Sequence, residues 1–372
     1  MLLPVVRTWK EWGELFTDVP RWRAAVEEIC CRESIPLCPV QAGYPGTNAV
    51  FILDQAYVVK IYAPFCHEDF YLERELYPIL ERDPRIPAPR LIAQGILDDQ
   101  MPWPYIVMDF KPGDPIRQVR AQISRANLTA IASEMGEIVR ALHSTPLEQL
   151  QTMDRSPEGW ARFVQARLEG CLEENRREGV LPETAIGEIP ALLASLQLDR
   201  DEPALVLLNG DLTEDHLLVH RSPLQQGDSE WYISGLIDFA DALVGPQEYE
   251  WIALWFGALD RDRACLRAFM ESYDPGVELD SAFSRRAMAF TFLHEFGAPI
   301  VATILRRLGN PHLRSIQELQ EILWGSWGEE KGKREKGQRG KREGGEGVGI
   351  WRSLPSRMML PKQDDASRAG CG

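Results

Sequence analysis

The 372-residue sequence has no long apolar run, no excess of positive charge and no cysteine spacing typical of a metal site. No segment approaches the ~20 apolar residues that a membrane helix needs, and the Lys-, Glu- and Trp-rich N-terminus does not resemble a signal peptide. The seven cysteines are scattered and odd in number, which does not favour a disulfide framework. We therefore expect reduced cysteines and a cytoplasmic protein with no membrane partner.

The charge balance is acidic, with 41 Lys and Arg against 56 Asp and Glu, and the formal net charge is -15. A nucleic-acid-binding protein normally has a basic face, so we expect no nucleic-acid partner. An acidic surface tolerates or attracts cationic substrates. The chain is 44% hydrophobic and contains 11 Trp and 13 Phe, which is ample for buried cores, and its length predicts about two domains.

The first 110 residues predict a small lobe that is rich in β-structure. The expected elements are helices over 8–33 and 67–82 and strands over 50–53, 57–62, 91–93 and 105–110. Pro112-Gly113 reads as a connection, and most of the chain from there to about residue 200 has helical patterns. We therefore predict an α+β protein with a β-rich lobe over residues 1–110 and a larger, mainly helical lobe over 111–325.

The last part of the chain differs in composition. Residues 328–349 are almost only Glu, Lys, Arg, Gln and Gly. Such a segment cannot bury enough apolar surface to offset the entropy cost of ordering it. We predict a disordered tail over residues 326–372 that is dispensable for chemistry; a polyelectrolyte binding tail is the alternative.

A glycine-containing turn precedes the first predicted hairpin. Glycines let backbone N–H groups approach phosphates closely, so the turn from Gly43 to Gly46 would suit a loop that covers a nucleotide. The alternative for such a turn is a simple entry to the hairpin.

Lys60 lies in an otherwise apolar strand, where an ammonium group needs an anionic partner. Glu75, in the following helix, shares a face with apolar side chains and is the predicted partner; Glu73, on a neighbouring face, competes with it. A Lys60–Glu75 pair would hold the ammonium against nucleotide phosphates. The alternative is an edge-strand lysine whose charged end reaches solvent.

Two apolar runs each end in an aspartate. Asp211 follows the run 204–208, and Asp238 follows a second strand-like run. If the segment between them folds back as a hairpin, Asp211, His216 and Asp238 meet at one rim. Asp211 would then accept or orient a hydroxyl proton, and Asp238 would ligate Mg²⁺, which prefers carboxylate oxygens. The alternative for each aspartate is a turn or a helix N-cap.

These features together resemble the aminoglycoside phosphotransferase and choline kinase-like superfamily, over roughly residues 40 to 300. The matching segments, in family order, are Val59–Ile61, Leu72–Glu75, Ile106–Phe110, Ala141–His143, Asn209–Leu212 and Leu236–Phe239 leading to Gly245–Trp251. The resemblance implies a bilobal protein-kinase-like fold, ATP and Mg²⁺ as cofactors, and transfer of the γ-phosphoryl group to a small-molecule hydroxyl.

The resemblance also implies roles for individual residues. Asp211 corresponds to the catalytic aspartate and Asp238 to the metal ligand. Met108 to Phe110 form the interlobe strand that meets the adenine edge. His143 matches a structural histidine at a helix end and has no expected catalytic role.

The sequence departs from the family pattern at two positions. Asn209 stands where the family usually has His, and His216 stands where it usually has a metal-binding Asn. Imidazole favours softer divalent ions than Mg²⁺, so His216 is a candidate ligand for Mn²⁺. It is alternatively a donor to a phosphate or to Asp211, or the mark of a nucleotide-binding pseudokinase or scaffold with weak or no turnover.

The acceptor is expected next to the segment that follows Asp238. Asp241, Glu248 and Glu250 are acidic, and aromatic residues lie nearby, so a cationic, aminoglycoside-like acceptor would fit. The alternative is that residues 248–255 form a helix that packs its Trp residues in the core. A sugar, an amino alcohol or another hydroxylated metabolite is the alternative acceptor.

Overall fold

The computed structural model describes residues 2–16, 18–43, 47–195, 204–223, 229–325 and 327. The chain forms two compact units. Of the described residues, the first unit contains those within 2–74 and 90–110, and the second contains those within 75–89 and 111–327. The chain passes from the first unit to the second after Phe110, where the lobe boundary was predicted. Residues 75–89, which precede that boundary, also belong to the second unit.

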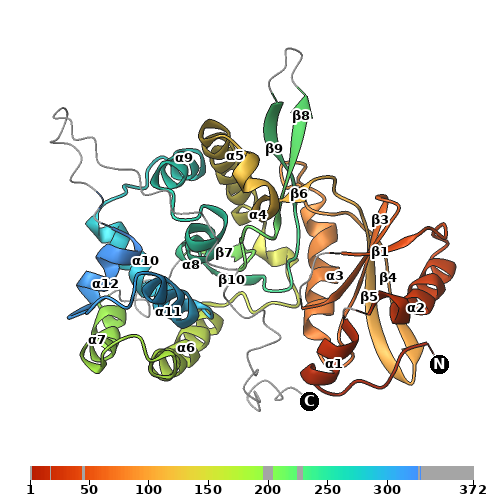
Figure 1. Cartoon of the computed structure of the whole chain (residues 1–372), viewed down its shortest axis with the longest axis horizontal. Helices are drawn as coiled ribbons and strands as arrows, with labels where there is room; N and C mark the ends of the chain where they lie inside the picture. Colours follow the sequence, from red (N-terminus) through yellow and green to blue (C-terminus); the bar gives the residue numbers. More distant parts are fainter. Residues whose placement is uncertain are drawn as a thin grey trace. The chain divides into compact units, whose positions relative to one another are not determined.

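The first unit is built on a five-stranded antiparallel sheet (Figure 1). Its strands are β1 Val40–Ala42, β2 Ala49–Leu53, β3 Tyr57–Ile61, β4 Leu91–Asp99 and β5 Met101–Asp109. Their order across the sheet is β1-β2-β3-β5-β4. The β2–β3 hairpin turns at Asp54 and Gln55, which both have positive φ (50° and 52°), as a type I′ turn requires; the Ala56 N–H closes this turn on the Leu53 carbonyl at 3.0 Å. The β4–β5 strands are longer than predicted.

Helices α1 (Trp9–Phe16) and α2 (Val19–Arg32) belong to the same unit. One helix over 8–33 was predicted, but Pro20 lies in the first turn of α2, where its missing N–H costs nothing, and a new helix starts there. Trp12 and Trp22 pack with Trp103 of β5 at ring-centroid distances between 5.7 and 6.2 Å. All three indoles are fully buried and belong to the core of this unit.

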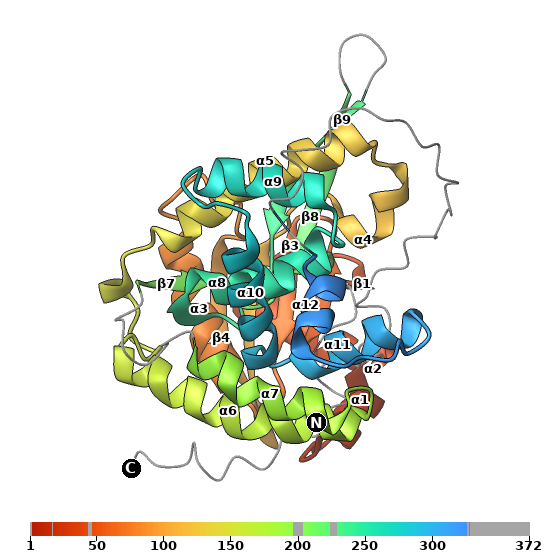
Figure 2. The ribbon, with the colours of Figure 1, turned by 90° about the vertical axis from the view of Figure 1, so that its left-hand side faces the viewer.

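Helix α3 (Glu68–Leu80) contains the first division between the units, after Arg74. The second unit is mainly helical. Its helices are α4 Ile116–Val119, α5 Arg125–His143, α6 Pro157–Glu178, α7 Glu183–Ala194, α8 Gln247–Ala253 with a π-helical turn over Leu254–Ala258, α9 Arg263–Tyr273, α10 Ser281–Leu293, α11 Gly297–Arg307 and α12 Ile316–Leu323. Helices α5 and α9 lie side by side (Figures 1 and 2).

Local sequence explains several helix starts. Ser124, Ser156, Asp262, Asp280 and Ser315 each accept a hydrogen bond from a backbone N–H of the first turn. These short polar side chains satisfy donors that have no partner inside the helix.

The α+β class predicted from the sequence is confirmed.

Two small sheets carry the polar loops of the second unit. A three-stranded sheet has the order β6-β8-β9 and contains β6 Asp114–Pro115, β8 Leu217–Pro223 and β9 Ser229–Leu236. A two-stranded sheet pairs β7 (Leu205–Leu208) with β10 (Leu243–Pro246). The antiparallel β8–β9 hairpin joins the two predicted aspartate-bearing loops, as expected from the sequence.

The predicted disordered tail lies outside the described residues except for Trp327. This indole is buried against Trp255 and Phe283, and the guanidinium of Arg263 lies 4.6 Å from its ring centroid. The packed part of the second unit therefore reaches at least one residue into the predicted tail.

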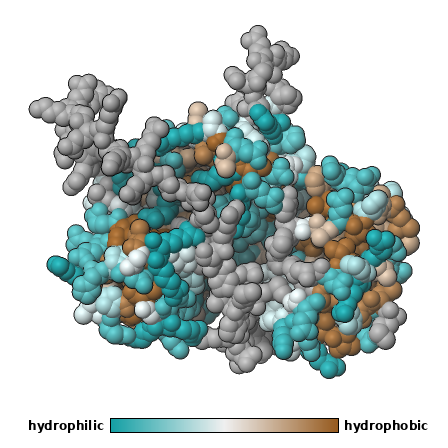
Figure 3. Space-filling model, viewed as in Figure 1, coloured by the Kyte–Doolittle hydropathy of each residue, from teal (hydrophilic) through white to brown (hydrophobic). Residues whose placement is uncertain are grey.

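Exposed large apolar side chains are scattered. They include Phe65, Tyr71, Ile92 and Ile96 on the first unit, and Figure 3 shows apolar patches among hydrophilic side chains on one face. Within the described residues, no single helix is long and apolar enough to span a membrane; α10 and α11 meet that test only as a pair bent by 111°.

Candidate functional site

The first unit contains a buried ion pair between strand β3 and helix α3. The Lys60 ammonium lies 2.6 Å from Oε2 of Glu73, and the two side chains are 5% and 0% exposed. Oε2 of Glu73 also accepts a 2.6 Å hydrogen bond from the Tyr62 hydroxyl. Burial of a charge is tolerated when it is paired and hydrogen-bonded, and this cluster meets both conditions.

The predicted Lys60–Glu75 pair is wrong. The Glu75 carboxylate instead accepts hydrogen bonds from the backbone N–H groups of Gln151 and Thr152 and from the Thr152 hydroxyl, all in the second unit. Glu73 lies on the fully buried stripe of α3 with Phe70 and Tyr77. Both faces of this helix carry apolar residues, so periodicity alone did not separate them.

The other predicted nucleotide-binding residues lie around the same sheet. The Gly43 N–H donates to the Val50 carbonyl at 2.7 Å, and a Cβ at Gly43 would meet Val50 Cγ1 at 2.6 Å, so a larger residue would not fit unchanged. Gly46 lies outside the described residues. Met108 is buried in β5, and the Phe110 N–H donates to the Ala56 carbonyl at 3.0 Å. The nucleotide-binding roles of these residues stay predictions.

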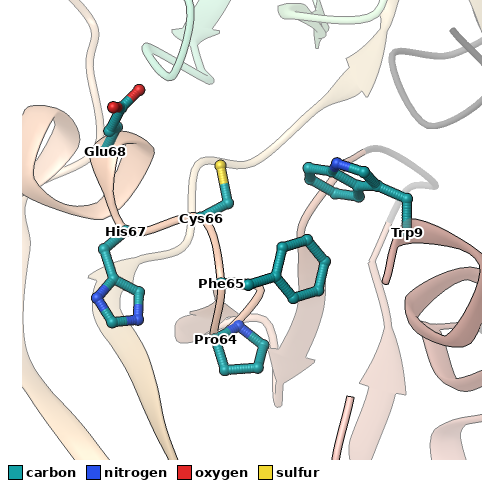
Figure 4. Close-up of a pocket in the computed structure, with 6 residues that line it drawn as sticks. All are labelled: Trp9, Pro64, Phe65, Cys66, His67 and Glu68. Atoms are coloured by element: carbon teal, nitrogen blue, oxygen red, sulfur yellow. The ribbon is translucent and has the colours of Figure 1, made fainter. Parts of the chain in front are cut away.

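A recess of about 490 Å³ lies on the first unit at the connection between β3 and α3 (Figure 4). It is lined by Trp9, Pro64, Phe65, Cys66, His67 and Glu68. The edge of the Phe65 ring meets the Trp9 ring at a centroid distance of 5.0 Å. Neither Lys60 nor Glu73 lines the recess, so it is separate from the ion pair.

In the second unit, the loops after β7 and β9 bring Asp211, His216 and Asp238 together. His216 Nδ1 lies 2.9 Å from the backbone oxygen of Asp211 and 3.3 Å from its Oδ2. His216 Nε2 lies 3.7 Å from Asp238 Oδ2. The predicted meeting of these three side chains is confirmed, and their catalytic roles stay predictions.

Unusual backbone conformations hold these loops. Gly210 has φ 81°, and a Cβ there would lie 2.2 Å from the backbone oxygen of Asp241, so only glycine fits. Asp238 has φ 61°, a left-handed conformation that costs energy for a residue with a Cβ. Its Oδ1 accepts a hydrogen bond from the Ala240 N–H at 3.2 Å, which is a local compensation.

Asn209 connects the two aspartate loops. Its side-chain amide donates to the backbone oxygen of Asp238 at 2.9 Å, and its Oδ1 accepts from the Asp211 N–H at 3.2 Å. One short amide therefore fixes the backbone of both aspartates. This geometry gives Asn209 a structural role at the position where the family usually has histidine.

Glu250, which the sequence suggested as a possible substrate-binding residue, is engaged inside the fold. Its side chain is fully buried, and its carboxylate accepts hydrogen bonds from the backbone N–H groups of Asn209 at 2.6 Å and Gly210 at 3.1 Å. His143 Nε2 lies 3.5 Å from Glu250 Oε2, and its Nδ1 is 2.8 Å from the Tyr273 hydroxyl. Glu250 therefore anchors the loop that carries Asp211, and His143 has the structural place that the resemblance implied.

The other two acidic candidates differ in their surroundings. Glu248 forms a 2.5 Å ion pair with Arg286, so a cationic acceptor would compete with a guanidinium for it. Asp241 is half-buried, and its backbone packs directly on Gly210. Contact of Asp241 and Glu248 with an acceptor stays a prediction.

Arg117 was missed by the sequence analysis. Its guanidinium pairs with Glu214 at 3.2 Å and with Asp215 at 2.5 Å, and its N–H donates to the Glu214 carbonyl. Burial raises the pKa of Glu214, and the Arg117 charge opposes that rise. Arg117 thus ties α4 to the loop between Asp211 and His216; no local motif marks a pair between segments so distant in sequence.

The electrostatics around His216 depend on its two carboxylate neighbours. Burial disfavours the imidazolium form, but the charges of Asp211 and Asp238 outweigh burial and raise the pKa of His216 to about 9. These two charges therefore favour the imidazolium form of the ring.

The same residues fit a divalent cation. A metal-bound histidine usually donates its other ring N–H to a carbonyl or carboxylate, and the backbone oxygen of Asp211 lies where His216 Nδ1–H donates. Nε2 then faces Asp238 Oδ2. The described residues contain no cluster of three or more His, Cys, Asp or Glu side chains that holds a cation by itself. A cation here would need further oxygen ligands, as Mg²⁺ commonly obtains from phosphates.

Comparison with known proteins agrees with this geometry. A sequence model of the phosphotransferase enzyme family matches residues 37–290, more than half of the chain. The protein therefore belongs to the phosphotransferase enzyme family, and the predicted relation to the aminoglycoside phosphotransferase superfamily is confirmed.

Solved structures share the fold at low sequence identity. The GDP complex of aminoglycoside 2'-phosphotransferase-IIIa is 18% identical, with a TM-score of 0.57 over 81% of this chain and 96% of that one. The GDP and kanamycin complex of APH(2")-IIIa is also 18% identical, with a TM-score of 0.57 over 81% of this chain and 97% of that one. A thermostable variant of APH(4)-Ia with ADP and hygromycin B is 15% identical, with a TM-score of 0.51 over 80% of this chain and 95% of that one. The predicted kinase-like fold is thereby confirmed.

Proposed function

We propose that the protein transfers the γ-phosphoryl group of a nucleoside triphosphate, ATP in the first instance, to a hydroxyl group of a small molecule. The observation that carries this proposal is the meeting of Asp211, His216 and Asp238 at two adjacent loops. Membership in the phosphotransferase family supports the reaction class. The buried Lys60–Glu73 pair of the first unit supports a site for phosphate oxygens.

In this proposal, positioning and charge neutralisation provide most of the catalysis. Asp211 orients the acceptor hydroxyl and receives its proton. Asp238 and His216 Nε2 would hold Mg²⁺ or Mn²⁺, and the bound cation would neutralise phosphate charge. Lys60, held by Glu73, contacts phosphate oxygens, and Met108 to Phe110 contact the base.

We propose a hydroxylated amine or sugar as the acceptor. The solved relatives named above contain kanamycin and hygromycin B. Asp241 is half-buried, whereas Glu248 is engaged by Arg286 and Glu250 is fully buried. This distribution favours an acceptor with few positive charges over a polycation.

The test is release of ADP or GDP by purified protein with ATP or GTP, an acceptor panel, and Mg²⁺ or Mn²⁺. Asp211→Asn is expected to lower acceptor-dependent turnover by about 10²–10⁴-fold, the usual contribution of a general base, with nucleotide affinity unchanged. Asp215→Asn is the matched control, because it removes a carboxylate that pairs with Arg117 in the same loop. Equal turnover in the two variants would contradict the role of Asp211.

A second candidate function is a nucleotide-binding protein without turnover. The observation that favours it is the position of the His216 ring, which lies 3.3 Å from the Asp211 carboxylate and 3.7 Å from that of Asp238, where it competes with a metal. Nucleotide binding without acceptor-dependent turnover in any metal would select this candidate. Recovery of turnover in His216→Asn would assign the loss to the ring.

A further inference from the structure

The hydroxyl of Tyr62 shares one carboxylate oxygen with the Lys60 ammonium. Both donors lie 2.6 Å from Oε2 of Glu73. Tyr62 is fully buried, and the ammonium of Lys60 lies 5.5 Å from the centroid of its ring, within the range of a cation–π contact. The three side chains therefore form one buried cluster within the first unit.

The position of the Tyr62 hydroxyl is fixed by its surroundings. The Tyr62 N–H donates to the Pro104 carbonyl at 2.9 Å, and its ring packs edge-on against Phe70 of α3 at 5.6 Å. A tyrosine has few rotatable bonds, so a buried ring holds its hydroxyl in one place. Lys60 and Glu73, by contrast, are long side chains that lose much rotamer freedom on ordering.

We propose that Tyr62 is a positioning residue that holds Glu73, and through it the Lys60 ammonium, in the phosphate-binding geometry before the nucleotide arrives. This inference rests on the proposed function. A short hydrogen bond from a phenol to a carboxylate is charge-assisted and directional. It fixes the rotamer of Glu73, so the nucleotide need not supply the entropy cost of ordering the pair.

The inference predicts that the effect is specific to the phosphates. Loss of the hydroxyl should weaken binding of a nucleoside triphosphate and leave binding of the corresponding nucleoside unchanged, because the ammonium contacts phosphate rather than the base. One net hydrogen bond corresponds to roughly 2- to 13-fold in an equilibrium constant, so we expect about a fivefold rise in the triphosphate Kd of Tyr62→Phe. The value of kcat should change less than the nucleotide KM.

The chain offers a matched control. The Tyr105 hydroxyl donates to Glu33 Oε1 at 2.5 Å in the same unit, and Tyr105 is the partner of Ile61 across β3 and β5. Tyr105→Phe therefore removes a similar tyrosine–glutamate hydrogen bond that does not involve Lys60. Calorimetric Kd values for ATP, GTP and their nucleosides, with the Tm of each variant, would be compared with those of the wild type.

The expected result is weaker triphosphate binding in Tyr62→Phe alone, with coupling between Tyr62→Phe and Glu73→Gln in a double-mutant cycle. Unchanged triphosphate binding in Tyr62→Phe would overturn the inference and leave the proposed function intact. An equal loss for nucleoside and triphosphate would also overturn it, because the hydroxyl would then support the whole unit. If the wild type binds neither triphosphate, the proposed function itself fails.

Discussion

Replacement of Glu250 by Gln is expected to destabilise the loop that carries Asp211. The buried carboxylate accepts two backbone N–H groups, from Asn209 and Gly210. Glutamine keeps one acceptor oxygen and turns an NH₂ group toward the other donor. A hydrogen bond to a charged group contributes about 1.5–3 kcal/mol, and a buried donor without an acceptor costs about 1–3 kcal/mol. We therefore expect a loss of about 3 kcal/mol in the free energy of unfolding.

The assay is thermal unfolding of the purified variants. For a domain of 150–250 residues, 1 kcal/mol shifts Tm by about 2–4 °C, so Glu250→Gln should lower Tm by roughly 6–12 °C. Glu248→Gln is the control on the same helix, because Glu248 pairs with the half-exposed Arg286. Surface ion pairs contribute about 0–1 kcal/mol, so its Tm should fall by at most about 4 °C. Equal shifts in the two variants would refute the anchoring role of Glu250.

Three further predictions follow from the second unit. Gly210→Ala should cost more than about 1 kcal/mol, because it forces a Cβ into a left-handed backbone and against the Asp241 carbonyl; a wild-type Tm would contradict this. Burial lowers the pKa of His294 to about 3, so below pH 6.5 the unfolded state binds a proton that the folded state does not. The free energy of unfolding should therefore decrease as the pH is lowered, by up to about 1.4 kcal/mol per pH unit. His294→Asn lacks this titrating group, so the difference in free energy of unfolding between the wild type and the variant should shrink as the pH is lowered from 7 to 5. A difference that stays constant would refute the lowered pKa of His294. His216→Asn should shift metal activation from Mn²⁺ toward Mg²⁺, measured as the ratio of turnover rates in the two metals, and loss of all activity would show that His216 does more than replace Asn.

Local sequence patterns predicted the elements that carry the chemistry. Apolar runs ending in Asp211 and Asp238 are strands β7 and β9, and the segment between them folds as the expected hairpin. Period-2 and period-3.6 patterns also placed β2, β3 and α3 with small boundary errors. These features are encoded locally, because each depends on residues within a few positions of one another.

Partner choice was harder to predict. The sequence placed Glu73 and Glu75 on neighbouring faces of one helix, and only the packing of α3 decided which face meets β3. Glu250 was assigned to the acceptor because carboxylates with aromatic residues nearby would suit a cationic amine. In the fold, α8 is buried, and the carboxylate meets two backbone donors from a segment about forty residues earlier.

The sequence by itself indicated the family, the order of the main elements and the candidate residues of the site, because these depend on local periodicity and motif. Only the tertiary structure decided that Lys60 pairs with Glu73, that Asn209 binds both aspartate loops and that Glu250 accepts two backbone N–H groups. The physical reason is that a buried charge or backbone donor must find a partner in space. Such a partner often comes from a distant segment, and local sequence periodicity does not indicate which segment that is.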